Sequence, residues 1–253
     1  MNTKSLYLRA SKEEISKYVV FSGDPLRVGK IITLLEDVEQ IAVSREYHTY
    51  TGMYKGVKVT ISSTGIGGPS AAIAMEEMYD CGMEVAIRLG TVMGLKDNLG
   101  KYIIPKAVMR EESTSKVYVD ASYPAVADFE LLQCMNESVV KNKAEYDNGI
   151  MCTLDGYYSD MKESRLSKQM GTDVLGKIAS YHKYNIVGLD MESGVILTLA
   201  NLMGIKGCVV TLTTVLENLV KFMEAEERAN AEELLARIVL DGIVIYDQKQ
   251  KES

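Results

Sequence analysis

Short runs of β-branched and apolar residues alternate with segments of helical periodicity along most of the chain. The runs lie at residues 18–21, 57–62, 85–89, 102–105, 150–153, 185–188 and 208–213. Helical patterns lie between or after them, at residues 26–35, 69–79, 128–142, 167–182, 192–203 and 224–246. Such alternation is typical of an α/β protein, in which crossover helices pack against a central sheet. We therefore expect an α/β fold.

The length of the chain is compatible with one large domain. Its 253 residues are 47% hydrophobic, which is enough to bury a full core. We expect residues 1–253 to form this single domain. There is no apolar run of membrane-spanning length, and no apolar signal core follows Met1. These features predict a cytoplasmic protein without a membrane partner.

Charge, cysteine and histidine content exclude several function classes. The net charge of −7 argues against a nucleic-acid partner, which needs a positive surface. The four cysteines lack C-x-x-C spacing and clustered histidines, so we expect buried thiols rather than a zinc site or a disulfide framework. The chain has two histidines, which disfavours a hydrolase that depends on a catalytic Ser-His or Cys-His relay.

Two segments have weak periodicity and are expected to be irregular. They cover residues 112–124 and 155–168, and the second combines glycine, aromatic and charged residues. Long irregular segments within a compact domain are usually functional loops or lids. The charged stretch at residues 224–237 is expected to be an ordinary solvated helix face.

A glycine-proline turn joins the first expected strand to the first expected helix. It reads Gly23-Asp24-Pro25, and Arg27 follows in the first helical turn. Glycine lets the backbone approach a ligand, and helix N-terminal amides together with an arginine can face one anion. The alternative is a plain strand-to-helix turn with a surface arginine, and this motif alone does not decide between them.

Two further motifs favour an anion site. Residues 63–70 form a glycine-rich turn before a helix, without the spacing of a dinucleotide fold or the lysine of a P-loop. Arg88 ends an apolar strand, where an unpaired charge is costly. A guanidinium matches phosphate oxygens in bidentate fashion, and Thr91 adds a hydroxyl. We therefore expect a phosphate-like anion beside Arg88.

The chain resembles the nucleoside phosphorylase family, and most closely the uridine phosphorylases, in an ordered series of motifs. These are Gly23-Asp24-Pro25 with Arg27, Ser44-Arg45-Glu46-Tyr47, residues 63–70, Arg88-Leu89-Gly90-Thr91, residues 123–129 and Asp190-Met191-Glu192-Ser193. The likeness spans nearly the whole chain. It implies a nucleoside phosphorylase-like fold, with a mixed, partly barrel-like central β-sheet flanked by helices.

The resemblance implies a pentosyltransferase of pyrimidine salvage. Inorganic phosphate, the co-substrate, would attack the anomeric carbon of uridine or a related nucleoside and release the base and (deoxy)ribose 1-phosphate. No further cofactor is expected apart from a possible K⁺. The residues that match the family's phosphate ligands are Gly23, Arg27, Arg45, Arg88 and Thr91. The three arginines are the expected catalytic residues.

The resemblance also implies ribose and base sites. Met191, Glu192 and Tyr7 match the ribose contacts. The expected base contacts are Val92, Met93, Tyr157, Asp160, Arg165 and Val215. Glu46, Ile66 and Ser70 match positions that hold a monovalent cation in some relatives, and plain interface packing is the alternative.

Arg45 matches an arginine that relatives lend across a subunit interface. The resemblance therefore implies a homo-oligomer, either a dimer or a trimer of dimers.

Departures from the family pattern keep two alternatives open. Met93 stands where relatives usually have glycine, no glutamine lies near Asp160, and Tyr7 replaces a histidine. A catalytically divergent nucleoside-binding protein is therefore one alternative, and a hydrolytic nucleosidase is the other. Val215 falls near the place of the aspartate that purine-specific relatives use, and Glu217 is the nearest acid, which disfavours a purine substrate.

Overall fold

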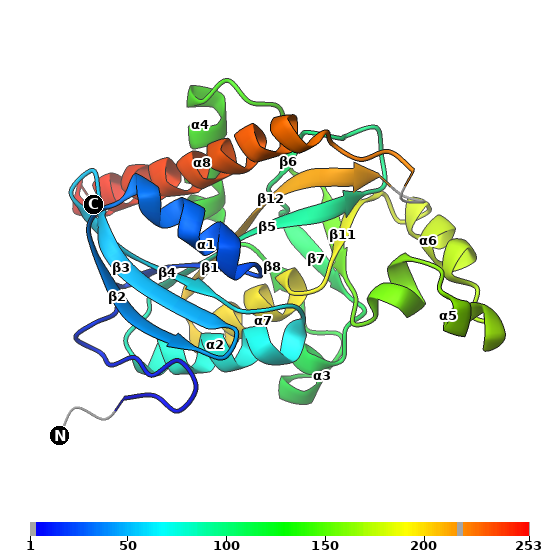
Figure 1. The fold of residues 1–253 in the computed structure, drawn as a ribbon, viewed down its shortest axis with the longest axis horizontal. Coiled ribbons are helices and arrows are strands. Elements are labelled where there is room, and N and C mark those ends of the chain that lie inside the picture. Colours follow the sequence, from blue (N-terminus) through cyan, green and yellow to red (C-terminus); the bar gives the residue numbers. More distant parts are fainter. Residues whose placement is uncertain (1–3, 217–219, 253) are drawn as a thin grey trace.

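The computed structural model describes residues 4–216 and 220–252, and it confirms the α/β class. A central sheet lies between layers of helices (Figure 1). The strands are β1 (Tyr18–Ser22), β2 (Glu36–Ser44), β3 (Tyr47–Tyr54), β4 (Val57–Ser63), β5 (Val85–Gly94), β6 (Tyr102–Ile103), β7 (Ala107–Arg110), β8 (Ala125–Val126), β9 (Tyr146–Asp147), β10 (Ile150–Thr153), β11 (Ile186–Asp190) and β12 (Lys206–Leu216).

The helices differ widely in length. They are α1 (Pro25–Ile31), α2 (Gly68–Asp80), α3 (Thr114–Tyr118), α4 (Phe129–Lys141), α5 (Arg165–Gln169), α6 (Val174–His182), α7 (Ser193–Met203) and α8 (Ala225–Glu252). A 3₁₀ turn, η1 (Ile32–Leu34), extends α1, and a π-helical turn, η2 (Tyr157–Met161), precedes α5. No helix in the described ranges is long and apolar enough to cross a membrane.

The sheet is mixed, because it contains parallel and antiparallel strands, and β5 pairs with three other strands, β1, β11 and β12. Strands β4, β1, β5 and β12 run parallel, whereas β2 and β3 add an antiparallel hairpin to β4. Along one edge of β5, β1 pairs with Val85–Leu89, and β11 then pairs antiparallel with Met93 and Gly94. Beyond β11, the order continues through β10, β7 and β8. The mixed sheet expected from the resemblance is therefore confirmed.

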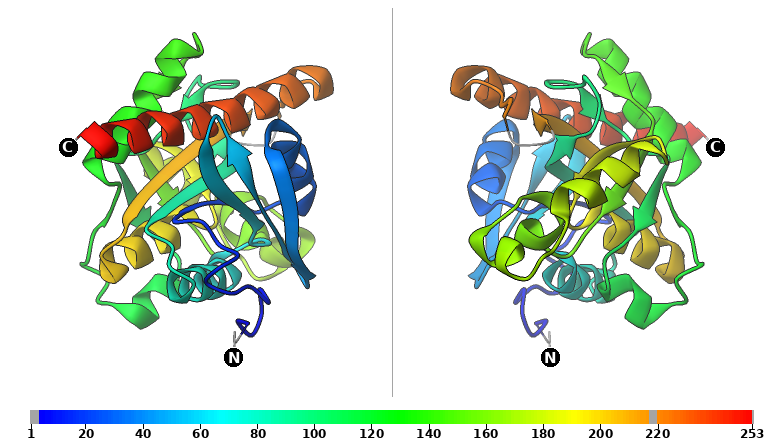
Figure 2. Two further views of the ribbon diagram at one scale, coloured as in Figure 1. Left: turned by 90° about the vertical axis from the view of Figure 1, so that its left-hand side faces the viewer. Right: turned by 90° about the vertical axis from the view of Figure 1, so that its right-hand side faces the viewer.

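Alternating residues of the central strands face two helical layers. On β1, Tyr18 and Val20 belong to the core beneath α4 and α8, whereas Val19 and Phe21 belong to the core against α2 and α7. This period of two is the ordinary geometry of a strand buried on both faces. Figure 2 shows the long α8 on one side of the sheet and α2 on the other.

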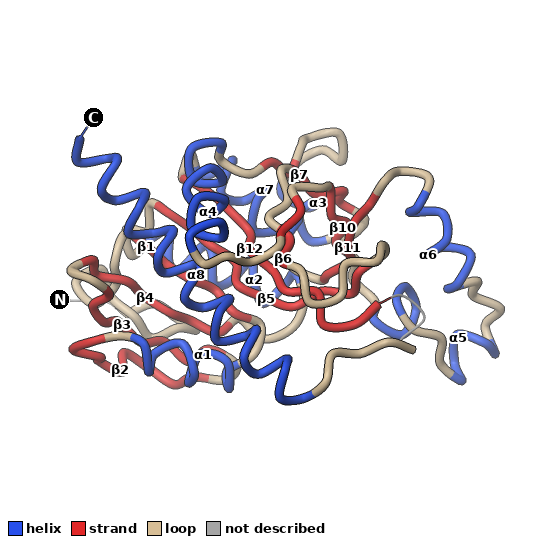
Figure 3. Tube along the Cα trace, turned by 90° about the horizontal axis from the view of Figure 1, so that it is seen from above, coloured by secondary structure: helices blue, strands red, loops and turns tan. Residues whose placement is uncertain are grey.

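Helices α5 and α6 lie together at one end of the molecule, away from the crossing of α8 over the sheet (Figure 3). The sequence predicted one helix over residues 167–182, which is wrong. The chain instead turns at Gly171, whose φ is +68°, and a new helix begins after Asp173, whose carboxylate caps the Gly176 N–H at 2.8 Å. Such a left-handed turn followed by an N-cap separates two helices.

The β2–β3 hairpin is the main element that sequence patterns missed. Glu36–Gln40 are all exposed, so β2 shows no apolar alternation in its first half. An edge strand with polar residues on both faces carries little signal for a strand. The turn between β2 and β3 holds Arg45 at a φ of +54°, in the left-handed region.

Three smaller expectations also need correction. Residues 112–124 contain α3, and residues 155–168 contain η2 and the start of α5, so neither segment is wholly irregular. Arg88 lies inside β5 rather than at its end, because the strand continues to Gly94. The expectation of buried free thiols is confirmed for all four cysteines, Cys81, Cys134, Cys152 and Cys208.

Candidate functional site

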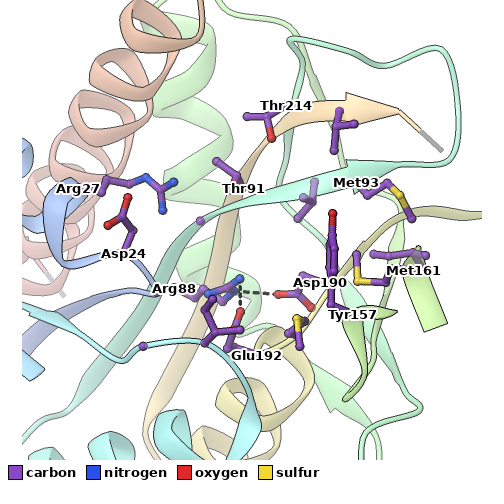
Figure 4. A pocket seen from close by; sticks show the side chains of 18 of the residues that line it. Asp24, Arg27, Arg88, Thr91, Met93, Tyr157, Met161, Asp190, Glu192 and Thr214 are labelled. Atoms are coloured by element: carbon purple, nitrogen blue, oxygen red, sulfur yellow. Dashed lines mark hydrogen bonds and ion pairs between the residues drawn. The ribbon is translucent and has the colours of Figure 1, made fainter. Parts of the chain in front are cut away.

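A pocket of about 720 Å³ opens where the parallel strands end (Figure 4). Loops that follow β1 and β4 supply one side, the second half of β5 crosses its floor, and β11, β12, η2 and α8 complete it. Carboxyl ends of parallel strands meet at one edge of a sheet, which is where α/β proteins place ligands. Of the expected site residues, the pocket wall includes Gly23, Arg27, Glu46, Ile66, Arg88, Thr91, Val92, Met93, Tyr157, Met191, Glu192 and Val215.

Arg88 forms the centre of a buried charge network. Its side chain shares the α2–α7 face of β5 with Ala86, two residues earlier, and so points toward the beginning of α7. Nε lies 2.8 Å from Asp190 Oδ2, and Nη2 lies 2.5 Å from Glu192 Oε2. These ion pairs involve two of the three guanidinium nitrogens, and a guanidinium has five N–H donors in all.

Asp190 and Glu192 differ in how they are held. Asp190 accepts hydrogen bonds from the Thr153 hydroxyl at 2.6 Å and from the Ser193 amide and hydroxyl at 3.0 and 2.5 Å. Glu192 accepts one from the Gly67 N–H at 2.6 Å. Burial raises the pKa of Glu192, and the nearby Asp190 adds to this effect, although the positive charge of Arg88 acts in the opposite direction.

Gly90 allows the Arg88 guanidinium to lie flat along β5. The two residues share one face of the strand, and a Cβ on Gly90 would lie 2.9 Å from Arg88 Nη2 and 3.0 Å from Cζ. A flexible arginine would ordinarily move aside. Here Asp190 and Glu192 hold the guanidinium, so any movement breaks short ion pairs.

If Arg88 binds the phosphate expected from the sequence, Gly90→Ala should weaken that binding by about tenfold, because the new methyl group displaces the guanidinium by a fraction of an ångström. The measurement is the KM for phosphate, with the melting temperature measured in parallel. Gly29→Ala is the matched control, because nothing lies within 4 Å of a Cβ at Gly29. An unchanged phosphate KM in Gly90→Ala would contradict the close approach described here.

Arg27 is the second buried cation at the pocket. It is 5% exposed, its Nη1 lies 3.3 Å from the Ser22 hydroxyl, and its Nη2 lies 3.4 Å from Glu232 Oε1. Gly23 precedes the N-cap residue of its helix, Asp24, whose carboxylate accepts a hydrogen bond from the Leu26 N–H at 2.8 Å. In Figure 4, Arg27 and Asp24 lie on one side of the pocket and Arg88 lies below it.

The opposite end of the pocket is apolar. Met93 packs in one cluster with Met161 and Leu189, against Tyr157 and Val215. The thioethers of Met93 and Met161 lie beside the Tyr157 ring in Figure 4. Met93 pairs with Leu189 on β11 and with Val215 on β12, so strand register holds it in place. Met93 is therefore both a core residue and a pocket residue, because it is 2% exposed and still lines the cavity.

The structure does not bring Asp160 and Arg165 to this end. Asp160 forms an ion pair with Lys177 at 2.6 Å and accepts a hydrogen bond from the Gly156 N–H at 3.0 Å. Arg165 begins α5 and is exposed. Neither residue lines the pocket in this structure, and their expected base contacts stay predictions. In the π-helical turn, Tyr157 and Met161 lie four residues apart and line the cavity, whereas Asp160 bonds back to Gly156.

Arg45 and Tyr7 lie together outside this pocket. The Arg45 guanidinium is 5.3 Å from the centre of the Tyr7 ring, and the Tyr7 N–H donates to Glu77 Oε1 at 2.8 Å. Arg45 is exposed on the hairpin turn. Arg45, which was expected to reach a neighbouring subunit, and Tyr7, an expected ribose contact, therefore lie side by side, and their roles stay predictions.

The expected cation residues gather around the glycine-rich turn. Glu46 lies against Gly65, and the Ser70 hydroxyl donates to the Gly67 carbonyl at 3.3 Å. Within residues 4–216 and 220–252, no group of three His, Cys, Asp or Glu side chains is placed to hold a metal ion. A monovalent cation at Glu46, Ile66 and Ser70 stays a prediction. Glu217 lies outside the described residues.

Sequence reasoning missed several residues of the pocket wall. Met161, Leu189 and Thr214 line it, and so does Arg228 from α8. Arg228 belongs to the stretch that was interpreted as a solvated helix face, and nothing in its local pattern marks it as part of a site. Only the crossing of α8 beside α1 brings it there, as the Arg228–Glu232 and Arg27–Glu232 ion pairs show.

Comparison with known proteins gives a consistent family. Residues 17–243 match the model of the phosphorylase superfamily. The chain is 38% identical to a uridine phosphorylase of Thermococcus kodakarensis over 78% of this chain and 72% of that protein. It is 31% identical to a guanosine phosphorylase of Halorubrum lacusprofundi, over 83% of each chain. A crystal structure of uridine phosphorylase from Vibrio fischeri superposes with a TM-score of 0.84 at 31% identity, covering 95% of this chain and 97% of that one.

Proposed function

The chain belongs to the phosphorylase superfamily, and on that premise we propose that it catalyses the phosphorolysis of uridine or a related nucleoside. The observation that carries this proposal is one pocket containing two buried arginines, Arg27 and Arg88, and a buried carboxylate, Glu192. Arginines that face a cavity favour an oxyanion, and a carboxylate beside them can accept hydrogen bonds from sugar hydroxyls.

The geometry supports a mechanism without a nucleophilic side chain. Phosphate would lie between Arg27 and Arg88, near the Gly23 backbone and the Thr91 hydroxyl, with the ribose held by Glu192 and packed against Met191. A phosphate oxygen forms a bond to the anomeric carbon while the bond between that carbon and the base breaks. The electron pair of the broken bond leaves with the base. Holding the two reactants in line and stabilising an oxocarbenium-like transition state supplies the acceleration.

The apolar end of the pocket suits a planar base. Tyr157 provides an aromatic wall, and the thioethers of Met93 and Met161 are polarizable groups that pack well against rings. Among the described residues at this end, the Tyr157 and Thr214 hydroxyls are the side-chain donors available to the ring oxygens of a departing pyrimidine. We propose that shape and these hydroxyls select the base.

We further propose a cytoplasmic homo-oligomer in which Arg45 and Tyr7 complete a neighbour's pocket. Arg45 is exposed on the hairpin turn and the half-buried Tyr7 lies against it, outside the pocket of their own subunit, which supports this arrangement.

Phosphate dependence separates phosphorolysis from both alternatives. We expect uridine to yield uracil and ribose 1-phosphate in equal amounts with phosphate, and neither product without it. Chromatography of the base and ³¹P NMR of the sugar phosphate are the measurements. Equal uracil release with and without phosphate would indicate a hydrolytic nucleosidase. Nucleoside binding without any turnover across a panel of nucleosides would indicate a divergent binding protein.

A further inference from the structure

Arg228 reaches the pocket from α8, an element to which no site residue was assigned. It lines the same cavity as Gly23, Arg27 and Thr91. Its Nε lies 2.9 Å from Glu232 Oε1, one helical turn further along. The side chain is 46% exposed, and an ion pair at that exposure contributes little stability. Pairing with Glu232 alone therefore does not explain the position of Arg228.

Glu232 links Arg228 to Arg27. The same oxygen, Oε1, lies 3.4 Å from Arg27 Nη2, and Oε2 lies 3.4 Å from Lys30 Nζ. Glu232 is almost fully buried, and burial acts to raise its pKa. The nearby charges of Arg27, Arg228 and Lys30 outweigh that effect and lower the pKa. The carboxylate is therefore ionised and positions both arginines at the pocket.

The charges at this end of the pocket do not cancel. Three cations, Arg27, Lys30 and Arg228, surround the single carboxylate of Glu232. Two further carboxylates line the cavity: Asp24 already caps α1, and Glu46 lies against Gly65. Glu232 itself is shared by three cations, so it does not neutralise both Arg27 and Arg228, which favours an added anion beside them.

Arg27 carries an unsatisfied donor at the same place. Its Nε is buried and has no hydrogen-bond partner in the described structure, although the residue is 5% exposed. A buried N–H without an acceptor is costly, and such donors in a cavity are commonly satisfied by a ligand or water.

We propose that Arg228 is a phosphate-binding residue supplied by α8 of the same subunit, and that Glu232 is a positioning residue that presents Arg27 and Arg228 to the anion. The proposal rests on the proposed function, because the oxyanion is the phosphate co-substrate. It adds a fourth guanidinium, from a helix that the sequence pattern assigned to solvent.

Arg228→Ala tests the proposal against a closely matched control. We expect the KM for phosphate to rise roughly tenfold, as for the loss of one charge-assisted hydrogen bond, while the KM for uridine changes less than about twofold. Arg237→Ala is the control: Arg237 lies on the same helix, is 47% exposed and pairs with Glu233 at i−4. Equal phosphate KM values in the two variants would overturn the proposal.

The role of Glu232 is tested by comparing the KM for phosphate with the KM for uridine. Glu232→Gln removes the charge that orients both arginines, so we expect a higher phosphate KM with the uridine KM retained. Glu232→Asp keeps the charge and should restore part of the loss. A merely structural role would lower the melting temperature in both variants without this selective change, and that result would overturn the positioning role.

Titration calorimetry with inorganic phosphate separates this proposal from the proposed function. If the wild-type protein turns over no nucleoside but binds phosphate, and Arg228→Ala binds it about tenfold more weakly, the function fails and the Arg228 site stands. If the wild-type protein shows phosphate-dependent turnover and Arg228→Ala binds phosphate as tightly as Arg237→Ala, the function stands and the Arg228 site fails.

Discussion

Replacing Arg88 with methionine should lower kcat/KM for phosphorolysis on the order of 10³-fold, the upper range for loss of one preorganised donor. Methionine keeps most of the side-chain volume and removes the charge. The variant loses the proposed phosphate contact and also frees Glu192, which Arg88 holds at 2.5 Å. Steady-state kinetics with phosphate and uridine varied separately is the measurement. Near-normal activity would refute the proposed role of Arg88.

The same variant should also be less stable, so folding must be measured with it. Without Arg88, the buried carboxylates of Asp190 and Glu192 face each other with no cation between them. Removing one partner of a buried ion pair costs about 3–5 kcal/mol. Arg88→Lys retains the positive charge, so it should unfold at a urea concentration between those of the wild-type protein and Arg88→Met. If Arg88→Lys folds normally and still shows the full kinetic loss, the effect lies in phosphate binding rather than in folding.

Replacing Arg45 with alanine should lower turnover by about 10²-fold while the protein stays folded. Arg45 is exposed on the hairpin turn, so its removal leaves no buried charge unpaired. Lys55→Ala is the matched control, because Lys55 also lies in a hairpin turn at positive φ, +48° against +54° for Arg45. Near-normal turnover in Arg45→Ala would refute its catalytic role.

A mixed oligomer decides whether Arg45 acts across a subunit interface. Subunits carrying Arg45→Ala and subunits carrying Arg88→Met are each expected to be nearly inactive. In a mixed dimer, the pocket of the Arg45→Ala subunit retains its own Arg88 and receives Arg45 from the partner. Activity should therefore return on mixing after reversible unfolding. No recovery in mixed oligomers of demonstrated composition would place Arg45 in its own subunit's site.

Short-range sequence patterns predicted those parts of the site that lie within short segments of the chain. The turn after β1 and the glycine-rich turn after β4 follow apolar runs, and residues of both line the pocket. The Met191-Glu192 pair, which the resemblance supplied, also lines it. Arg88 was recognised because an arginine in an apolar strand requires a partner. Its partners in the structure are Asp190 and Glu192, which lie about a hundred residues away in the chain.

Local patterns failed where contacts between distant segments decide the role of a residue. Asp160, a base contact that the resemblance implied, forms an ion pair with Lys177 on α6 and lies outside the pocket wall. Arg228 was assigned to solvent, because helical periodicity reports which face is polar and not what lies opposite that face. The β2–β3 hairpin was missed because its edge strand has no buried face to impose an alternation.

The α/β class, the strand-to-helix turns and the family could be read from the amino-acid sequence, because they depend on short-range periodicity and on the order of motifs along the chain. Tertiary structure alone decided which charges meet. The crossing of α8 beside α1 places Arg228 with Arg27, and the register of β5 against β11 and β12 places Met93 in the wall of the pocket. Electrostatic pairing and packing depend on distance in space, which no local pattern encodes.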